Sequence, residues 1–105
     1  MKPVETTLSF DEMMDALRDV HRRTILLGLG DHESRPTDSA GSPDETSRRS
    51  QVAMRHVHLP KLDTAGLVVW DERRNRVSRG PRFEEIRPLL RLLDDNRDAL
   101  PADWA

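Results

Sequence analysis

The sequence contains no cysteine among its 105 residues. Disulfide bonds and cysteine-ligated zinc are therefore excluded. It also has no apolar run close to the roughly 20 residues needed to cross a bilayer. Its first residues, Met1 to Leu8, lack the order of basic, apolar and small residues that marks a secretory signal. These absences predict a cytoplasmic protein without a membrane partner.

Catalytic signatures are missing as well. We find no glycine-rich phosphate loop, no nucleophile elbow and no paired-carboxylate motif. A chain of this length can hardly enclose a pocket of ordinary size. We therefore expect a protein that is not an enzyme and has no cofactor.

A metal site is not expected either. His56 and His58 are two residues apart, which on a helix turns their side chains about 200° from one another. Chelation by one helix needs a spacing of three or four. His32, between Asp31 and Glu33, could offer ligands from a loop, but no spaced set accompanies it. His56 is more simply a partly buried helix residue.

Length and composition indicate one small domain. Hydrophobic residues make up 35% and charged residues 34% of the chain, and the apolar ones cluster in 8–29, 52–70 and 83–93. Residues 30–50 have almost none. We predict a domain over residues 9–95, between a flexible N-terminus (1–8) and a loose tail (96–105).

The charge is unevenly distributed. The net charge of −2 divides into −5 over residues 1–45, +6 over residues 46–82 and −3 over residues 83–105. A basic middle between acidic ends can present one cationic face to a polyanion. A random fluctuation in a charge-rich chain is the alternative.

Two helices are predicted before residue 30. Ser9 and Glu12 form a capping-box pattern, and apolar residues such as Met13 and Leu17 follow at helical spacing. A second apolar group begins at Ile25, so the joint between the helices falls near residues 18–20. Residues 30–47 offer nothing to bury and are predicted to form a polar loop, either functional or in place of an element of the fold.

The second half predicts a helix, a hairpin and a helix. Residues 48–65 form the strongest helical pattern, with a kink at Pro60 and an end at Gly66. Residues 67–79 indicate a two-stranded hairpin with a charged tip, and residues 82–95 a final helix. The fold class is therefore mainly α with a small β-hairpin, a winged helix-turn-helix.

A family resemblance supports this fold. The segments Arg22-Arg23-Thr24-Ile25-Leu26 and His58-Leu59-Pro60-Lys61-Leu62, the second followed by Ala65-Gly66-Leu67-Val68, resemble a haloarchaeal group of winged helix-turn-helix domains, more distantly ArsR-like. The resemblance covers roughly residues 9–79 and leaves 30–47 unmatched. It implies a dimeric transcriptional regulator whose helix 48–65 is the recognition helix and whose hairpin 67–79 is the wing.

Candidate DNA contacts follow from the basic middle. No acid occurs from Thr46 through Leu62, and arginine, lysine and glutamine suit phosphates and base edges. Arg55 could instead be a structural partner, and charged hairpin tips are often simply solvated. The predicted DNA-binding residues are Arg48, Arg49, Gln51, Arg55, His58 and Lys61 on the helix, and Arg73, Arg74, Arg76 and Arg79 on the wing.

The final helix is the candidate dimer interface. It carries a wide apolar stripe, and two-fold DNA half-sites favour dimeric readers. Packing onto the protein's own core is the alternative. Together these features predict a DNA-binding transcriptional regulator acting as a homodimer on double-stranded DNA; the alternative is a protein–protein interaction module that does not read DNA. The stripe consists of Phe83, Ile86, Leu89, Leu90 and Leu93.

Overall fold

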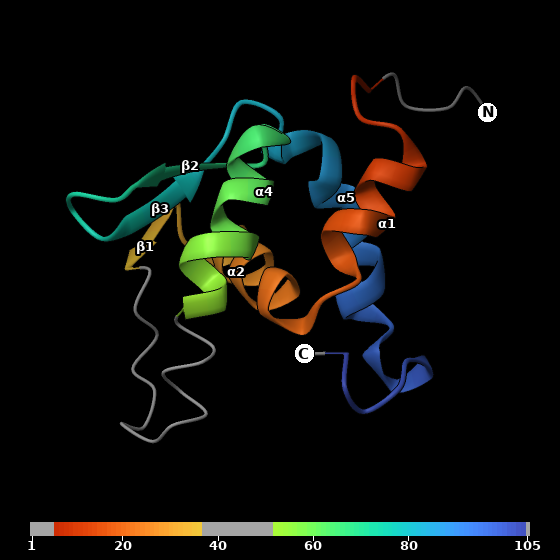
Figure 1. Cartoon of the computed structure of the whole chain (residues 1–105). Helices are drawn as coiled ribbons and strands as arrows, with labels where there is room; N and C mark the ends of the chain where they lie inside the picture. Colours follow the sequence, from red (N-terminus) through yellow and green to blue (C-terminus); the bar gives the residue numbers. More distant parts are fainter. Residues whose placement is uncertain (1–5, 37–51, 105) are drawn as a thin grey trace.

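The computed structural model describes residues 6–36 and 52–104, and of Met54 and Arg55 it describes the backbone alone. Figure 1 shows the sheet at one end of the molecule and helices α1 and α5 at the other, with α2 and α4 between them. The described elements are α1 (Phe10–Leu17), α2 (Val20–Asp31), β1 (Ser34–Pro36), the π-helix η1 (Met54–His58), α4 (Leu59–Thr64), β2 (Val68–Asp71), β3 (Arg76–Arg79), α5 (Phe83–Asp95) and the 3-10 helix η2 (Arg97–Ala99).

This architecture is mainly helical with a small antiparallel sheet, and its topology is winged-helix-like, as the sequence predicts. Among the described residues, no helix is long and apolar enough to span a bilayer. The predicted recognition-helix residues Arg48, Arg49 and Gln51 lie outside the described residues.

Both N-terminal helices begin at a side-chain cap. Ser9 accepts a hydrogen bond from the backbone N–H of Glu12, and the Glu12 side chain accepts one from the backbone of Ser9. This reciprocal pair is the capping box that the sequence predicts. Asp19 caps α2 by accepting a hydrogen bond from the backbone N–H of His21. The predicted joint near residues 18–20 is confirmed.

The sheet has three strands in the order β1-β3-β2. β1 and β2 pair antiparallel with opposite edges of β3, so that Arg35 and Trp70 both lie opposite Val77. Residues 34–36 therefore form an edge strand, and the expectation of a loop throughout 30–47 is wrong for them. Because β1 is short and mostly exposed, no hydrophobic alternation marks it in the sequence. Residues 30 and 31 of the predicted loop belong to α2, so the expectation is wrong for them as well, and residues 37–47 lie outside the described residues.

The third helical segment changes type at its proline. Residues 54–58 are π-helical and residues 59–64 are α-helical, with Pro60 in the first turn of α4. Proline has no N–H to donate to the preceding turn, so an irregularity is expected here. Two residues beyond the end of α4, Gly66 has a left-handed φ of 80°. Hydrogen bonds from Gly66 N to Asp63 O and from Leu67 N to Leu62 O complete a Schellman motif.

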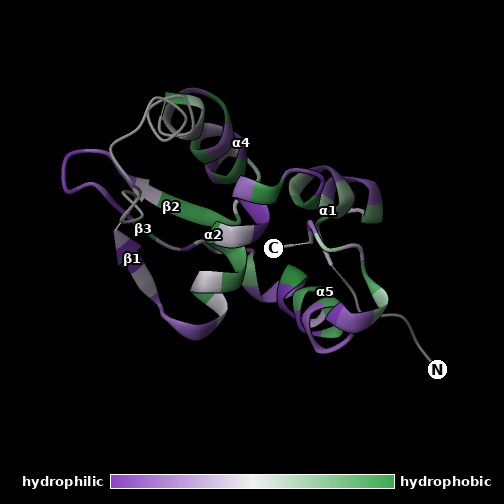
Figure 2. Ribbon diagram, turned by 90° about the horizontal axis from the view of Figure 1, so that it is seen from below, coloured by the Kyte–Doolittle hydropathy of each residue, from purple (hydrophilic) through white to green (hydrophobic). Residues whose placement is uncertain are grey.

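The apolar face of α5 packs onto the protein's own core. Phe83 and Ile86 are fully buried and Leu90 is 2% exposed, while Leu89 and Leu93 are partly buried against the same cluster. In Figure 2 the hydrophobic stretches of α1 and α5 lie next to one another. The predicted dimer interface is therefore wrong for Phe83, Ile86 and Leu90, because a chain with so few apolar residues uses this stripe to complete its interior.

The C-terminal segment is docked, in place of the loose tail expected over residues 96–105. Arg23 of α2 donates hydrogen bonds to the backbone oxygens of Trp104 and Asp103, at 2.5 and 2.9 Å, and to that of Leu17 at 2.7 Å. The guanidinium also lies 5.5 Å from the centre of the Trp104 ring. One arginine thus ties the tail to the joint between α1 and α2.

Candidate nucleic-acid interface

The β2–β3 hairpin forms the wing, which we define as residues 68–79. Its tip is residues 72–75, where Asn75 has a left-handed φ of 54° and its N–H donates to Glu72 O. Asp71 stabilises the turn, because its carboxylate accepts a hydrogen bond from the backbone N–H of Arg74 at 3.2 Å. Figure 2 shows the tip as a hydrophilic loop that projects from the edge of the molecule.

Three of the predicted wing arginines lie at the surface. Arg73 is exposed and has no ion-pair partner among the described residues. Arg74 is 83% exposed at its side chain and lies 3.7 Å from Asp71, so its charge is only partly compensated. Arg76 is exposed and donates to the Ser34 hydroxyl at 3.1 Å. These three residues are the exposed cations of the wing.

Arg79 is used differently. It donates to Leu29 O at 2.6 Å and to Gly30 O at 3.4 Å, and its guanidinium lies 5.6 Å from the ring centre of Phe83. The two carbonyls belong to the last turn of α2, whose oxygens lack partners within the helix. Arg79 therefore holds the sheet against α2, and its predicted place among the DNA contacts is wrong in this structure.

Lys61 is half-exposed and paired. Its ammonium lies 2.7 Å from a carboxylate oxygen of Asp15 on α1. The hydrogen bond from Lys61 is the main reason that the pKa of Asp15 lies below its usual value. Among the predicted helix contacts, Arg55 belongs to η1, but its side chain lies outside what the structure describes.

His58 is turned into the interior. Only 7% of its surface is exposed, and its Nε2 lies 3.4 Å from Asp19 Oδ1. Burial lowers the pKa of His58 and outweighs the opposing effect of the Asp19 carboxylate. The enclosed imidazole cannot reach a duplex. Its predicted role in DNA contact is wrong because the helix buries this side towards α2.

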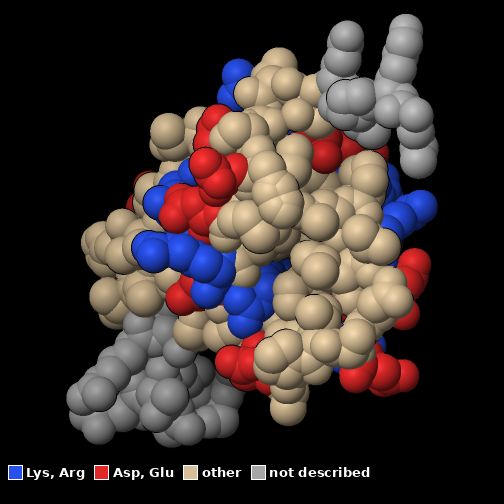
Figure 3. All heavy atoms as spheres, turned by 90° about the vertical axis from the view of Figure 1, so that its right-hand side faces the viewer, with Lys and Arg blue, Asp and Glu red and all other residues tan. Residues whose placement is uncertain are grey.

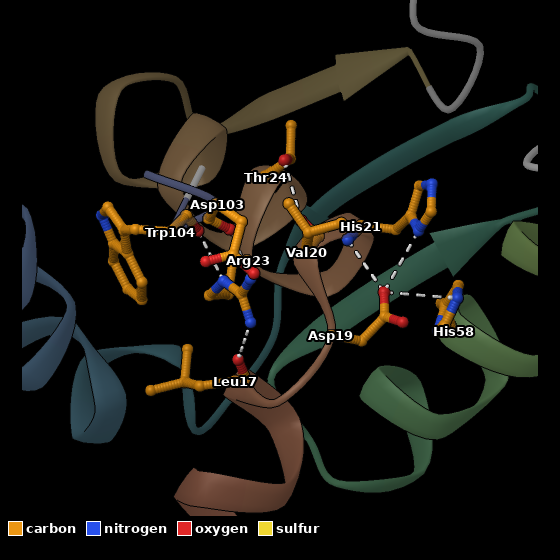
Figure 4. Close-up of polar contacts among 9 residues, drawn as sticks. All are labelled: Leu17, Asp19, Val20, His21, Arg23, Thr24, His58, Asp103 and Trp104. Carbon is orange, nitrogen blue, oxygen red and sulfur yellow. Dashed lines mark hydrogen bonds and ion pairs between the residues drawn. The ribbon is translucent and has the colours of Figure 1, made fainter. Parts of the chain in front are cut away.

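Asp19 is the acceptor at the centre of this contact (Figure 4). Burial raises its pKa, yet the hydrogen bond from the backbone N–H of His21 and the neighbouring histidines together keep the pKa below the usual value for an aspartate. The His21 ring lies 3.2 Å from the same oxygen and stacks on His58 with a centroid distance of 5.5 Å. The sequence did not indicate His21, because His21 and His58 are far apart along the chain and meet in the folded protein.

Charge on the face away from the wing is mixed. Figure 3 views the molecule from the right-hand side of Figure 1 and shows basic and acidic groups interspersed on a largely uncharged surface. A cavity of about 300 Å³ between α2 and α5 shows the same mixture, with Arg35, Arg87 and Arg91 beside Asp31 and Asp94. Basic side chains on this face are therefore accompanied by acidic ones.

The fold and the surface define a winged-helix-like domain with a cationic hairpin tip. A model of a family described as "Domain of unknown function (DUF7344)" matches residues 31–78, from the end of α2 to β3. The matched stretch is slightly less than half of the chain and contains β1, α4 and most of the wing. No curated protein and no solved structure matches the chain significantly.

Proposed function

We propose that this protein is a DNA-binding transcriptional regulator of the winged-helix type. The observation that carries the proposal is the exposed set of arginines at the wing: Arg73 and Arg74 at the tip and Arg76 at the start of β3. The winged-helix-like topology and the sequence resemblance to haloarchaeal, distantly ArsR-like winged helix-turn-helix domains support it.

The wing arginines combine reach with positive charge. Guanidinium groups along a projecting hairpin can grip phosphates or enter a minor groove. Asp71 and Glu72 offset part of this charge, so the wing supplies a modest, salt-sensitive attraction. The other proposed contacts are Arg48, Arg49, Gln51 and Arg55, which the sequence predicts to lie on a helix before the wing.

Fluorescence anisotropy with short duplexes prepared from genomic DNA tests the proposal. Arg73→Glu should weaken binding at least about tenfold relative to the unchanged protein. It should also reduce the slope of log affinity against log salt by about 1 for each phosphate that the variant no longer neutralises. Binding should weaken steadily as the salt concentration rises.

Arg91→Glu is the matched control, because Arg91 is exposed on α5 and its substitution changes the net charge by the same amount. The wing variant should lose far more affinity than the α5 variant. Equal losses would mean that net charge alone attracts DNA, and an absence of binding even at low salt would contradict the proposal.

The regulator is also proposed to act as a homodimer. With most of the α5 stripe buried, the exposed apolar residue of this helix is Leu92, at 60% exposure. Light scattering during size-exclusion chromatography should give twice the 12.1 kDa mass of one chain. Leu92→Asp should then give the mass of one chain; a monomeric mass for the unchanged protein would contradict the dimer.

A second candidate function is a protein–protein interaction module that does not read DNA. Exposed apolar side chains favour it: Val57 of η1 is 53% exposed and Val69 of β2 is 48% exposed. If this function holds, Val69→Asp abolishes capture of a defined protein partner, whereas Arg73→Glu leaves that capture and the activity in cells unchanged.

A further inference from the structure

Three side chains from two distant segments converge beside the joint between α1 and α2. Asp19 is the N-cap of α2, His21 lies in the first turn of that helix, and His58 is the last residue of η1. Asp19 Oδ1 lies 3.2 Å from His21 Nδ1 and 3.4 Å from His58 Nε2. Figure 4 shows both rings directed at the same carboxylate.

The spacing of these donor atoms suits a small metal ion. One ligand atom from each residue lies within 4.8 Å of the other two. Around a four-coordinate zinc ion with bonds of about 2.0 to 2.1 Å, ligand atoms lie about 3.3 Å apart. The two distances to Asp19 already match that separation, and only the two imidazole nitrogens need to approach one another.

The surroundings give this cluster both rigidity and access. His58 is enclosed, with 9% of its side chain exposed, whereas 40% of the His21 side chain and 32% of the Asp19 side chain are exposed. Asp19 is further fixed by the 2.8 Å hydrogen bond from the backbone N–H of His21. Two ligands thus face solvent, from which an ion and a water ligand can arrive.

The nearby charges select the kind of ion. Arg22 is buried next to His58 and acts on it electrostatically, and the N-terminus of α2 carries a positive partial charge. The cluster has a single carboxylate, that of Asp19, whereas Ca²⁺ and Mg²⁺ require several oxygen ligands. Two imidazoles instead favour Zn²⁺ and its chemical neighbours.

We propose that Asp19, His21 and His58 form a binding site for a transition-metal ion of the zinc type. The protein provides three ligands and leaves a fourth position open to water. The ion links α2 to the helix that leads into the wing. This proposal is independent of the proposed DNA binding and fails or stands separately from it.

The primary test titrates the full-length protein with Co²⁺ and follows its visible absorption, then displaces Co²⁺ with Zn²⁺. One ion should bind per chain, and His21→Gln should weaken binding at least about tenfold. His21→Gln is the main variant because its ring is half-exposed, so its loss leaves the core intact. His58→Gln should weaken binding at least as much, with circular dichroism verifying its fold.

His56→Gln is the matched control, since His56 lies on the same helical segment as His58 and is exposed, so its expected partial burial is wrong. Its affinity should equal that of the unchanged protein. Asp19→Asn separates capping from ligation, because asparagine caps a helix as well as aspartate does but carries no charge. It should keep the fold and lose metal affinity.

Thermal unfolding gives a readout independent of spectroscopy. Zn²⁺ should raise the Tm of the unchanged protein and of His56→Gln but not that of His21→Gln, and Mg²⁺ or Ca²⁺ should have no effect. Absence of binding by the unchanged protein, or equal affinity in His21→Gln and His56→Gln, would overturn the site. In that case the cluster is a purely structural hydrogen-bonded contact between α2 and η1.

Discussion

At the tip of the wing, Arg73 and Arg74 extend into solvent, whereas at its base Arg79 lies across the end of α2. The two ends are a few residues apart, and both carry arginine. At the base, Gly80 N donates to Leu67 O and Arg82 N donates to Gly66 O, so the backbone there is also tightly joined. At the tip, the printed backbone contacts are those of the turn itself, from Asn75 N to Glu72 O and from Arg74 N to the Asp71 carboxylate.

The arginines of one basic segment therefore have two separate uses. The last turn of α2 contains no basic residue, and its carbonyl oxygens are satisfied from elsewhere. Arg79 supplies Leu29 O and Arg87 supplies Gly30 O, where positive charge also favours the helix dipole. Part of the +6 charge of residues 46–82 is therefore structural and is not available to a polyanion.

The largest expected effect is at the base of the wing. A Cβ atom added at Gly80 would lie 2.4 Å from Gly66 O and 2.6 Å from Val68 N, both of which are backbone atoms that cannot move aside. Gly80→Ala should therefore lower the free energy of unfolding by about 3 kcal/mol, or prevent folding. Urea unfolding followed by circular dichroism measures the loss.

Gly30→Ala is the control for this prediction. Gly30 lies within α2, and nothing is within 4 Å of a Cβ atom placed there. Because alanine favours a helix over glycine, this variant should gain about 0.5 to 1 kcal/mol. Similar losses at both glycines would show that the base of the wing is not closely packed.

The second-largest effect is a difference in stability between substitutions of two arginines on β3. Arg79→Met removes the charged donor from the oxygens of Leu29 and Gly30 and should cost about 2 kcal/mol. Arg76→Met, on the same strand but exposed, should cost less than about 0.5 kcal/mol. Equal losses in the free energy of unfolding, measured with urea, would show that Arg79 does not hold the base of the wing more firmly than Arg76 holds its strand.

A smaller effect is expected at the tip itself. Asn75 has a φ of 54°, which glycine adopts freely and alanine does not. Asn75→Ala and Asn75→Gly both remove the side-chain contacts of asparagine, so their difference isolates the backbone strain. The glycine variant should be more stable by about 1 kcal/mol. A reversed order would mean that the turn changes its conformation on substitution.

Sequence patterns predicted the features that depend on neighbours along the chain. The capping box at Ser9, the helix end at Gly66 and the hairpin itself are local, and all are confirmed. Helical periodicity also marked α5 correctly but could not say what covers its apolar face. The answer is the protein's own core, around Phe83.

Features that depend on distant contacts were missed or assigned incorrectly. β1 exists because β3 offers a free edge, Arg79 turns inward because α2 ends beside it, and His58 meets Asp19 only in the folded chain. An arginine that donates to a backbone oxygen cannot be recognised from the sequence, because every residue carries such an acceptor. Arg23, which joins the tail to α2 in Figure 4, is another such case.

The smallest predicted effect tests one of these distant contacts, just beyond the base of the wing. Glu85 of α5 accepts hydrogen bonds from the Thr7 hydroxyl and from the backbone N–H groups of Thr7 and Leu8. The hydrogen bond from the Thr7 side chain is the main cause of the lowered pKa of Glu85, and the hydrogen bond from the Leu8 N–H is the next.

A carboxylate whose pKa falls on folding stabilises the protein above its unfolded pKa, and the contribution disappears as the pH falls through the folded value. Glu85→Gln should therefore lower stability slightly at pH 7 and flatten its decline in acid, measured as Tm against pH. An unchanged acid profile would show that Glu85 does not hold the N-terminal segment.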